Sequence, residues 1–388
     1  MSNSQHFDCL VLGTGGVGSA ALYHLAKQGK RVAGIDRFGV AHDRGSSHGQ
    51  TRIIRQSYFE HPSYVPLVQR AFELWEQLQA EHGRDLYYQT GILQAGPSGG
   101  ELIQGVLASS EQHGLAIEHM NVVEARKRWP QFAFDDDMEV IFEQRAGFLL
   151  IEHAISAHVE KAQWAGAELF VGHTIDEVKT GGSCVEVITD QGSFTADSVV
   201  VTAGAWAADL LPELNGHLRI LNKPLHWYAA DADLYSNRVG CPVFFFESET
   251  GGYYGFPSID ERGLKLARHS GGIELTNPLE LDRSLDTEEQ GCVAGFLRKH
   301  LPQVSDQATD HAVCMYTVTS DSHFIIDRAR ADERVVYAAG LSGHGFKFAP
   351  ALGELLAKMA SGESHGYDLT QFRARPRINA NGVANEGE

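Results

Sequence analysis

A glycine-rich turn near the amino end constrains the fold more than any other feature of the chain. Residues 7–12 (FDCLVL) form a short apolar run typical of a buried parallel strand, and GTGGVG follows directly at residues 13–18. An amphipathic segment (19–27), a second apolar run (31–35) and Asp36 come next. The order of strand, GxGxxG, helix, strand and acid is typical of a dinucleotide-binding unit. The sequence therefore predicts a doubly wound α/β domain at this end.

Each glycine of the motif has its own physical task. Gly13 permits the tight turn, Gly15 lets the backbone approach a pyrophosphate, and Gly18 lets the helix pack against the sheet. The first N–H groups of the helix attract phosphate, and Asp36 is placed to accept a hydrogen bond from a ribose hydroxyl. The motif does not choose between FAD and NAD, although an acid at this position disfavours NADP. A glycine-rich turn without a ligand is the alternative interpretation.

Parallel-type strands recur along the chain. Residues 198–202 (SVVVT) and 334–338 predict two further buried strands, and strand-like alternation also occurs at residues 168–171, 184–189 and 193–195. Helices are expected at 64–80, 152–165 and 350–359, and the first has an apolar stripe formed by Val65, Val68, Phe72, Trp75 and Leu78. We expect a nucleotide-binding domain from residues 1–84, 146–219 and 315–375, a substrate domain from residues 85–145 and 220–314, and a disordered tail at 376–388.

Composition excludes several classes of partner and of site. The net charge of -18 at pH 7 repels nucleic acid and anionic membrane surfaces, so an anionic substrate needs a local cluster of basic groups. No stretch approaches the roughly 20 apolar residues of a membrane span, and no targeting signal is visible, so we expect a cytoplasmic protein. The 5 cysteines lack the spacing of a zinc or redox site, so we expect no metal. The chain also lacks an HExxH motif, a nucleophile elbow and a P-loop.

Five further motifs resemble one group of flavoenzymes. They are residues 45–55 (GSSHGQTRIIR), 253–257 (YYGFP), 263–266 (GLKL), 314–317 (CMYT) with 324–327 (FIID), and 343–348 (GHGFKF). In this order, with the glycine-rich turn, they resemble monomeric sarcosine oxidase, N-methyltryptophan oxidase and pipecolate oxidase over nearly the whole chain. The resemblance implies a Rossmann-like FAD-binding domain, a mostly antiparallel β substrate domain, covalent FAD and a monomeric enzyme.

The resemblance also assigns roles around the flavin. Cys314 corresponds to the cysteine bonded to the flavin 8α-methyl carbon, an electron-poor position that a thiolate attacks well. His48 and Arg52 correspond to positive groups at the flavin face, which raise its tendency to accept electrons. Lys265 corresponds to the lysine that activates oxygen, because a fixed cation stabilises the negative charge that develops on O₂. An ordinary buried cysteine and a solvated lysine are the alternatives for Cys314 and Lys265.

The substrate site is assigned in the same way. Arg55 and Lys347 correspond to the pair that grips the substrate carboxylate, because a guanidinium fork and an ammonium both favour this anion. Surface salt bridges are the alternative for these two residues. Tyr254 and His269 correspond to residues that line the amine site. The loop at 343–348 serves both flavin and carboxylate through Gly343, Gly345 and Lys347.

These assignments predict an FAD-dependent oxidase that acts on an N-methyl or cyclic secondary amino acid. Its products are an imine, which water hydrolyses, and hydrogen peroxide. The aromatic runs at 226–228 (HWY) and 244–246 (FFF) slightly favour a bulky side chain on the substrate. A pipecolate-type oxidase, a dehydrogenase that uses another electron acceptor and a flavin-binding regulatory protein are the alternatives.

Overall fold

The structure of the protein, a computed structural model, describes residues 5–374 of the 388 in the chain. Its contacts divide the chain into two compact units. Unit 1 comprises Met1–Ser47, Ile155–Leu221 and Tyr316–Glu388, and unit 2 comprises His48–Ala154 and Asn222–Met315. The tail expected at 376–388 lies outside the described residues.

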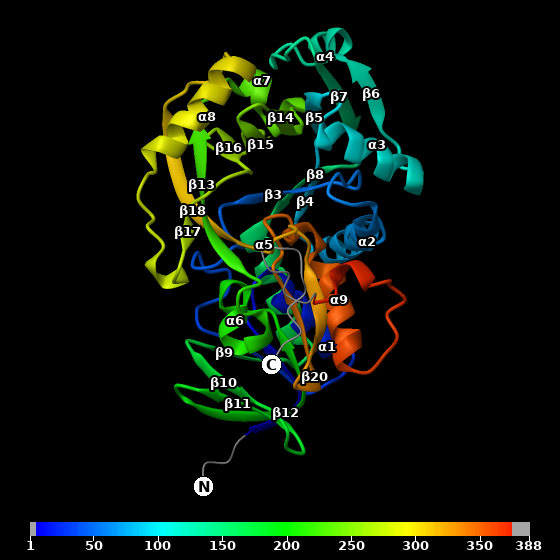
Figure 1. Ribbon diagram of the computed structural model, residues 1–388, viewed down its shortest axis with the longest axis vertical. Helices are drawn as coiled ribbons and strands as arrows, with labels where there is room; N and C mark the ends of the chain where they lie inside the picture. The colour runs from blue at the N-terminus through cyan, green and yellow to red at the C-terminus, as the bar shows by residue number, and fades with distance from the viewer. Residues whose placement is uncertain (1–4, 375–388) are drawn as a thin grey trace, which may run out of the picture. The chain divides into compact units, whose positions relative to one another are not determined.

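Unit 1 contains an 8-stranded sheet with a parallel centre (Figure 1). β1 (Gln5–Leu12) lies between β2 (Val32–Asp36) and β12 (Gly192–Val201) and runs parallel to both. β9 (Glu168–Val171) extends the parallel pairing beyond β2, and β20 (Asp332–Ala339) extends it beyond β12. The other strands pair antiparallel with their neighbours: β10 (Ile175–Lys179), β11 (Val185–Thr189) and β19 (Ile325–Ala329).

The central strands of unit 1 are apolar because helices cover the sheet. α1 (Gly16–Lys27) and α9 (Ala349–Ala360) both contact β12, and they pack against each other. A Cβ on Gly353 would lie 2.6 Å from the Cβ of Ala20, so glycine permits the close approach of these two helices. The α/β fold and the strands expected at the start, middle and end of the chain are confirmed.

Unit 2 holds nearly all of a 9-stranded, mainly antiparallel sheet (Figure 1). Its path runs β17-β13-β16-β15-β14-β5-β7-β6, and β18 pairs with β13. The pair β14–β5 is parallel. The strands are β5 (Ile92–Pro97), β6 (Glu118–Asn121), β7 (Met138–Glu143), β13 (Arg219–Tyr228), β14 (Val243–Ser248), β15 (Gly251–Phe256), β16 (Leu264–Arg268), β17 (Glu274–Leu275) and β18 (Ala308–Val318).

The two faces of this sheet bury different side chains, because successive residues of a strand point to opposite faces. One face packs Tyr228, Phe244, Phe246, Leu264 and Leu266 with side chains of α8 (Thr287–His300). The other face buries a separate cluster that includes Leu225, Trp227, Phe245, Tyr254, Ala267 and Cys314. The aromatic runs therefore divide between the two faces: Phe245 and Trp227 belong to one cluster, and Phe244, Phe246 and Tyr228 belong to the other. The size of the substrate side chain stays a prediction.

A 3-stranded sheet explains why the observed units differ from the expected domain boundaries. β3 (Thr51–Ile54) pairs antiparallel with β8 (Gly147–Leu150), which also pairs with β4 (Tyr87–Gln89). This pairing groups residues 48–84 and 146–154 with unit 2, whereas the sequence analysis assigned them to the nucleotide-binding domain. The pairing of β3 with β8 joins residues far apart in the sequence, so the apolar pattern near residue 47 does not indicate it.

The helices expected from the sequence are confirmed. The 64–80 pattern forms α2 (Val65–His82), and all five residues of its apolar stripe are buried. The remaining helices are α3 (Glu101–His113), α4 (Val122–Arg128), α5 (Ile151–Trp164), α6 (Ala207–Leu210) and α7 (Ala232–Tyr235). Short 3₁₀ turns are η1 (Pro62–Tyr64), η2 (Gly204–Trp206), η3 (Pro212–Leu214), η4 (Asn237–Val239), η5 (Pro278–Glu280), η6 (Phe346–Phe348) and η7 (Thr370–Phe372). Among residues 5–374, no helix is both long and apolar enough to cross a membrane.

Candidate active site

The glycine-rich turn of unit 1 shows a separate reason for each glycine. Gly13 has a φ of 87°, and a Cβ there would lie 2.7 Å from the carbonyl oxygen of Thr202. A Cβ on Gly18 would overlap the carbonyl oxygen of Gly13, so the first turn of α1 could not approach the turn. A Cβ on Gly15 would meet no atom within 4 Å, and no side chain caps α1 at this residue. The turn thus leaves open space beside the helix N–H groups, which suits a phosphate.

Asp36 ends β2 and holds the glycine-rich turn in place. Its Oδ2 accepts hydrogen bonds from the backbone N–H of Thr14 at 2.6 Å and from the Thr14 hydroxyl at 3.0 Å. Its Oδ1 accepts from the backbone N–H of Phe38 at 2.9 Å and lies 3.6 Å from Nε2 of His42. Two carboxylate oxygens offer about four acceptor positions, so a further donor such as a ribose hydroxyl remains chemically acceptable.

The loop at 343–348 also lies in unit 1. Gly343 has a φ of 79°, and a Cβ there would overlap the ring of Tyr316, while a Cβ on Gly345 would lie 2.5 Å from the Cβ of Leu341. Lys347 is 6% exposed, and its ammonium donates a hydrogen bond to the carbonyl of His344 at 2.8 Å. Lys347 therefore lies buried in a loop whose conformation requires glycine at positions 343 and 345. Its burial rules out a surface salt bridge for this residue.

A second loop, in unit 2, carries His48 and Arg52 and is held from several directions. Gln50 has a φ of 76°, in a region that costs a non-glycine residue about 1–3 kcal/mol. Glu152 offsets part of this cost, because its Oε1 accepts from the N–H groups of Gly49 at 2.7 Å and Gln50 at 3.1 Å. The Gln50 amide accepts from Nε1 of Trp227 at 3.0 Å and donates to Asp260 at 2.6 Å. This network fixes the loop.

Lys265 projects into the same loop from β16. It is 1% exposed, and its ammonium donates to the carbonyls of Gly49 and Thr51 and to the Thr51 hydroxyl, the last two at 2.9 and 3.1 Å. The ammonium also lies over the rings of Phe256 and Trp227, 4.7 and 5.6 Å from their centres. Burial, followed by the charge of Arg52, holds the pKa of Lys265 well below its usual value. Lys265 is thus a buried lysine held by the loop and not a solvated lysine.

Cys314 lies beside these cations, at the end of unit 2. Its thiol is fully buried and donates to the carbonyl of His48 at 3.4 Å, and a guanidinium nitrogen of Arg52 lies 3.5 Å from the sulfur. Burial raises the pKa of Cys314, but the charges of His48 and Arg52, a hydrogen bond with the side chain of His48 and the charge of Lys265 outweigh burial and bring the pKa down to about 7. A thiol with this pKa is substantially ionised at neutral pH, as a nucleophilic cysteine must be.

The imidazole ring of His48, close to Cys314, has a nitrogen that lacks a hydrogen-bond partner. Its ring is 5% exposed, and its Nε2 has no hydrogen-bond partner within residues 5–374. A buried polar atom without a partner is costly and calls for an explanation, such as a ligand that supplies the missing hydrogen bond. Together with the ionised thiol, this atom fits an electron-poor, hydrogen-bonding ring.

Arg55 is buried and already holds a carboxylate of the protein. Its guanidinium donates to both carboxylate oxygens of Glu60, at 2.9 and 2.7 Å, and to the carbonyl of Ser57 at 2.7 Å. The rings of Tyr58 and Phe59 lie 4.4 and 4.5 Å from the guanidinium carbon. At 4% exposure, Arg55 is not part of a surface salt bridge. Glu60, which accepts from one nitrogen of the guanidinium expected to face the substrate, was not predicted from the sequence.

Tyr254 and His269 lie together in unit 2. The ring of His269 stands nearly perpendicular to the rings of Phe245 and Tyr254, with centres 5.7 and 6.2 Å away. The backbone N–H of His269 donates to the carbonyl of Gly252 at 2.7 Å, which continues the pairing of β15 and β16. The two residues expected to line the amine site therefore share one aromatic cluster with Phe245.

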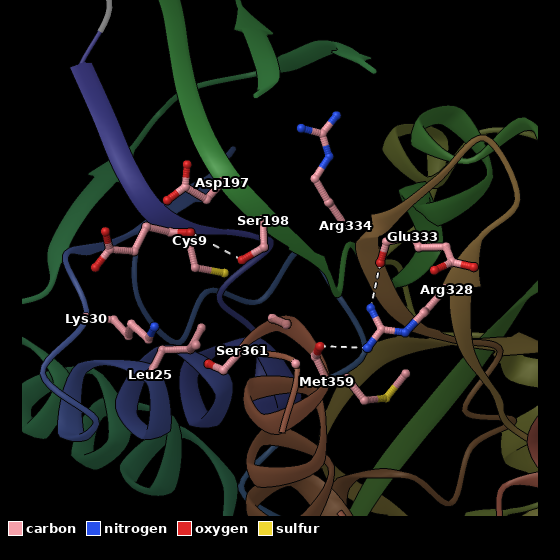
Figure 2. A pocket seen from close by; sticks show the side chains of 13 residues that line it. Cys9, Leu25, Lys30, Asp197, Ser198, Arg328, Glu333, Arg334, Met359 and Ser361 are labelled. Atoms are coloured by element: carbon pink, nitrogen blue, oxygen red, sulfur yellow. Dashed lines mark hydrogen bonds between the residues drawn. The ribbon is translucent and has the colours of Figure 1, made fainter. Parts of the chain in front are cut away.

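A cavity elsewhere in unit 1 does not have the features of a catalytic site. It has a volume of about 430 Å³, and its lining includes Cys9, Arg328 and Arg334 (Figure 2). Arg328 donates to the carbonyls of Glu333 and Met359, and Arg334 pairs with Asp332. Burial raises the pKa of Cys9 to about 12, so this thiol stays protonated at neutral pH. The charged groups of the cavity hold strand and helix ends together.

Comparisons with known proteins agree with this geometry. The pattern of a family described as FAD dependent oxidoreductase matches residues 8–359. The chain belongs to this family. It is 37% identical to a monomeric sarcosine oxidase of Bacillus sp. (strain B-0618), covering 95% of this chain and 96% of the relative. It is also 37% identical to an N-methyl-L-tryptophan oxidase of Yersinia pestis (strain Pestoides F), covering 94% of this chain and 98% of the relative. The resemblance found in the sequence is confirmed, and with it FAD dependence.

Solved structures of the same fold bear out the architecture. NikD, an unusual amino acid oxidase essential for nikkomycin biosynthesis, superposes with a TM-score of 0.83 at 23% identity, covering 95% of this chain and 98% of NikD. An L-proline dehydrogenase from P. horikoshii superposes with a TM-score of 0.82 at 21% identity, covering 96% of this chain and 97% of that protein. The fold class expected from the sequence is confirmed.

Proposed function

We propose that this FAD-dependent oxidoreductase is an oxidase of N-methyl or cyclic secondary amino acids. The neutral secondary amine loses a hydride from the carbon next to its nitrogen and then its N–H proton, which gives an imine that water hydrolyses. The two electrons and two protons removed from the substrate reduce oxygen to hydrogen peroxide. The observation that carries the proposal is the cluster of Cys314, Arg52, His48 and Lys265, in which three basic side chains lie around a buried thiol whose pKa is lowered to about 7. The names of the 37% identical relatives support the same chemistry.

The residues of both units fit FAD. In unit 1, the open side of Gly15 and the N–H groups of α1 suit the pyrophosphate, and Asp36 suits a ribose hydroxyl. In unit 2, the unsatisfied Nε2 of His48 suits a polar atom of the flavin ring, and the Cys314 thiolate suits the carbon to which the flavin would be bonded. Bound FAD would supply the acceptor for the hydride and the donor of electrons to oxygen. We propose that the attachment is covalent, through Cys314.

The substrate carboxylate is proposed to bind Arg55, and the family resemblance gives Lys347 the same role; each of the two side chains is buried within its own unit. For Arg55 this binding requires exchange, because its Nη2 donates to both carboxylate oxygens of Glu60 and its Nη1 donates to the carbonyl of Ser57. The substrate carboxylate would displace Glu60 from the guanidinium or bind beside it. The rings of Tyr58 and Phe59 already orient the guanidinium for this contact. This exchange favours substrates with a free carboxylate over simple amines.

The amine is proposed to lie beside Tyr254 and His269. We propose that burial beside these rings and Phe245 removes the substrate amine from water and so lowers its pKa. The neutral amine can release a hydride without a separate general base. Lys265 is proposed to stabilise the negative charge that develops on oxygen, because its ammonium is already fixed by the loop at 49–51. Oxygen as the acceptor, a monomeric state and a cytoplasmic location remain predictions.

A peroxide assay over a substrate panel tests the proposed function. The panel comprises sarcosine, N-methyl-L-tryptophan and L-pipecolate, each with its decarboxylated amine and its primary-amine counterpart. We expect peroxide from at least one secondary amino acid and little from the decarboxylated amines. Equal turnover of the decarboxylated amines would contradict the carboxylate clamp, and turnover of primary amines alone would contradict the substrate class. Flavin reduction without peroxide would instead identify a dehydrogenase.

A further inference from the structure

Lys223 is a buried cation that the proposed chemistry does not use. It lies on β13 with 3% of its surface exposed. Its ammonium donates to three consecutive carbonyls, those of His269, Ser270 and Gly271, at 2.7, 2.9 and 2.5 Å. An ammonium has three N–H donors, so each carbonyl can receive one. A buried lysine that grips three successive carbonyls fixes the path of that backbone.

The three carbonyls belong to a bulge between β13 and the strands that pair with it. At one end His226 pairs with Leu266, and at the other Asn222 exchanges hydrogen bonds with Ile273. The interval from 222 to 226 therefore faces the longer interval from 266 to 273, and the surplus residues loop out. Gly271 and Gly272 have φ values of 69° and 111°, which allow the backbone to turn back.

The bulge begins at His269, whose backbone is consequently held on both sides. Its N–H donates to the carbonyl of Gly252, and its carbonyl accepts from Lys223. Strand alternation puts Lys223 on the same face of β13 as Trp227, the face that also buries Tyr254. The ring of His269, which contacts the rings of Phe245 and Tyr254, thus depends for its position on the grip of Lys223.

We propose that Lys223 is a positioning residue that orients His269 in the amine site by gripping the carbonyls of residues 269–271. The proposal rests on the function proposed above for His269. Charged neighbours come from two elements: Arg268 on β16 pairs with Glu289 on α8 through both carboxylate oxygens, at 3.0 and 2.6 Å. Because these two residues balance each other, replacing Lys223 by a neutral residue leaves no lone carboxylate beside it.

Because Lys223 is buried, its three hydrogen bonds depend on the ammonium group of its side chain. Burial, partly opposed by Glu289, lowers the pKa of Lys223 to about 8. Methionine has a similar length but no donor, so Lys223→Met leaves the three carbonyls without this partner. Lys299→Met is the matched control, because Lys299 lies in the same unit on an exposed ion pair with Asp135.

Two measurements on the full-length, flavin-loaded protein test the proposal. Hydrogen–deuterium exchange should show faster exchange at residues 268–273 in Lys223→Met and no change in Lys299→Met. Anaerobic stopped-flow should show flavin reduction slowed on the order of 10- to 100-fold in Lys223→Met, since small displacements of a positioned group cost this much. Reoxidation by oxygen, which is assigned to Lys265, should stay within about twofold.

A double-mutant cycle separates positioning from general damage. In a His269→Ala background, Lys223→Met should add little further slowing of reduction, because the group that Lys223 positions is gone. Full additivity, equal slowing of both half-reactions, or unchanged exchange at 268–273 would overturn the proposal. If the unmutated protein oxidises no amino acid, the proposed function fails, while the exchange measurement still decides whether Lys223 holds the bulge.

Discussion

Replacing Lys265 by methionine should affect the two halves of catalysis unequally. Removing one well-placed cation typically costs on the order of 3 kcal/mol of transition-state stabilisation, or about a hundredfold in rate. That loss should fall on flavin reoxidation, where negative charge develops on oxygen. The substitution also removes the donor for the carbonyls of Gly49 and Thr51 and the Thr51 hydroxyl. Buried acceptors left unpaired cost about 1–3 kcal/mol each, so the unfolding midpoint should fall as well.

Stopped-flow spectroscopy with a thermal melt separates these two effects. Anaerobic mixing with substrate follows reduction, and mixing of reduced protein with oxygenated buffer follows reoxidation. We expect reduction within about threefold of the unmutated protein and reoxidation slower by about a hundredfold. Lys299→Met, which removes an exposed lysine of the same unit, should change neither rate. If Lys265→Met slows both half-reactions equally, Lys265 supports the loop at 49–51 and does not activate oxygen.

Two further predictions concern Arg55 and Cys314. Glu60→Gln removes the negative charge that competes with the substrate carboxylate for Arg55, so it should lower KM for the amino acid. Arg55→Met removes the guanidinium itself and should cost on the order of 3 kcal/mol in kcat/KM. An unchanged KM in Glu60→Gln would show that the substrate does not bind this guanidinium. In apoprotein mixed with FAD, flavin attachment should rise with pH through about 7 as the thiol of Cys314 ionises. Arg52→Gln removes a charge that lowers this pKa, so its attachment profile, measured as acid-precipitable flavin, should shift to higher pH; an unshifted midpoint would contradict the role of Arg52.

Local sequence patterns were sufficient for the elements of unit 1. Its central strands are continuous apolar runs, and α1 follows a motif whose glycines are dictated by contacts within a few residues or with one neighbouring strand. The boundary between the units was not predictable in the same way. From the sequence alone, β3 is assigned to the nucleotide domain because it follows that domain directly in the chain. Its pairing with β8, nearly 100 residues later, places it in unit 2.

The sequence also did not predict the long-range hydrogen-bond partners of the site residues. Motifs identified Cys314 with the neighbouring His48, Arg52 and Lys265, and also Arg55, but not the groups that hold the loop at 49–51 or the acid that pairs with Arg55. Glu152 holds the loop at 49–51 from more than 100 residues away, and Gln50 is fixed by Trp227 and Asp260 from still farther. Only Glu60, five residues after Arg55, lay close enough for a spacing argument, since an acid and an arginine this near in sequence commonly pair. Long-range hydrogen bonds leave no local pattern.

Covalent attachment of the flavin is the claim on which the proposed chemistry depends most. The proposal is supported by a fully buried thiol that lies among His48, Arg52 and Lys265 and has a pKa of about 7. The direct measurement is mass spectrometry of the purified protein after acid precipitation and proteolysis. We predict that the peptide containing Cys314 carries the mass of FAD or of its hydrolysed flavin, and that Cys314→Ala lacks it. An unmodified Cys314 peptide, with all flavin in the supernatant, would contradict the account.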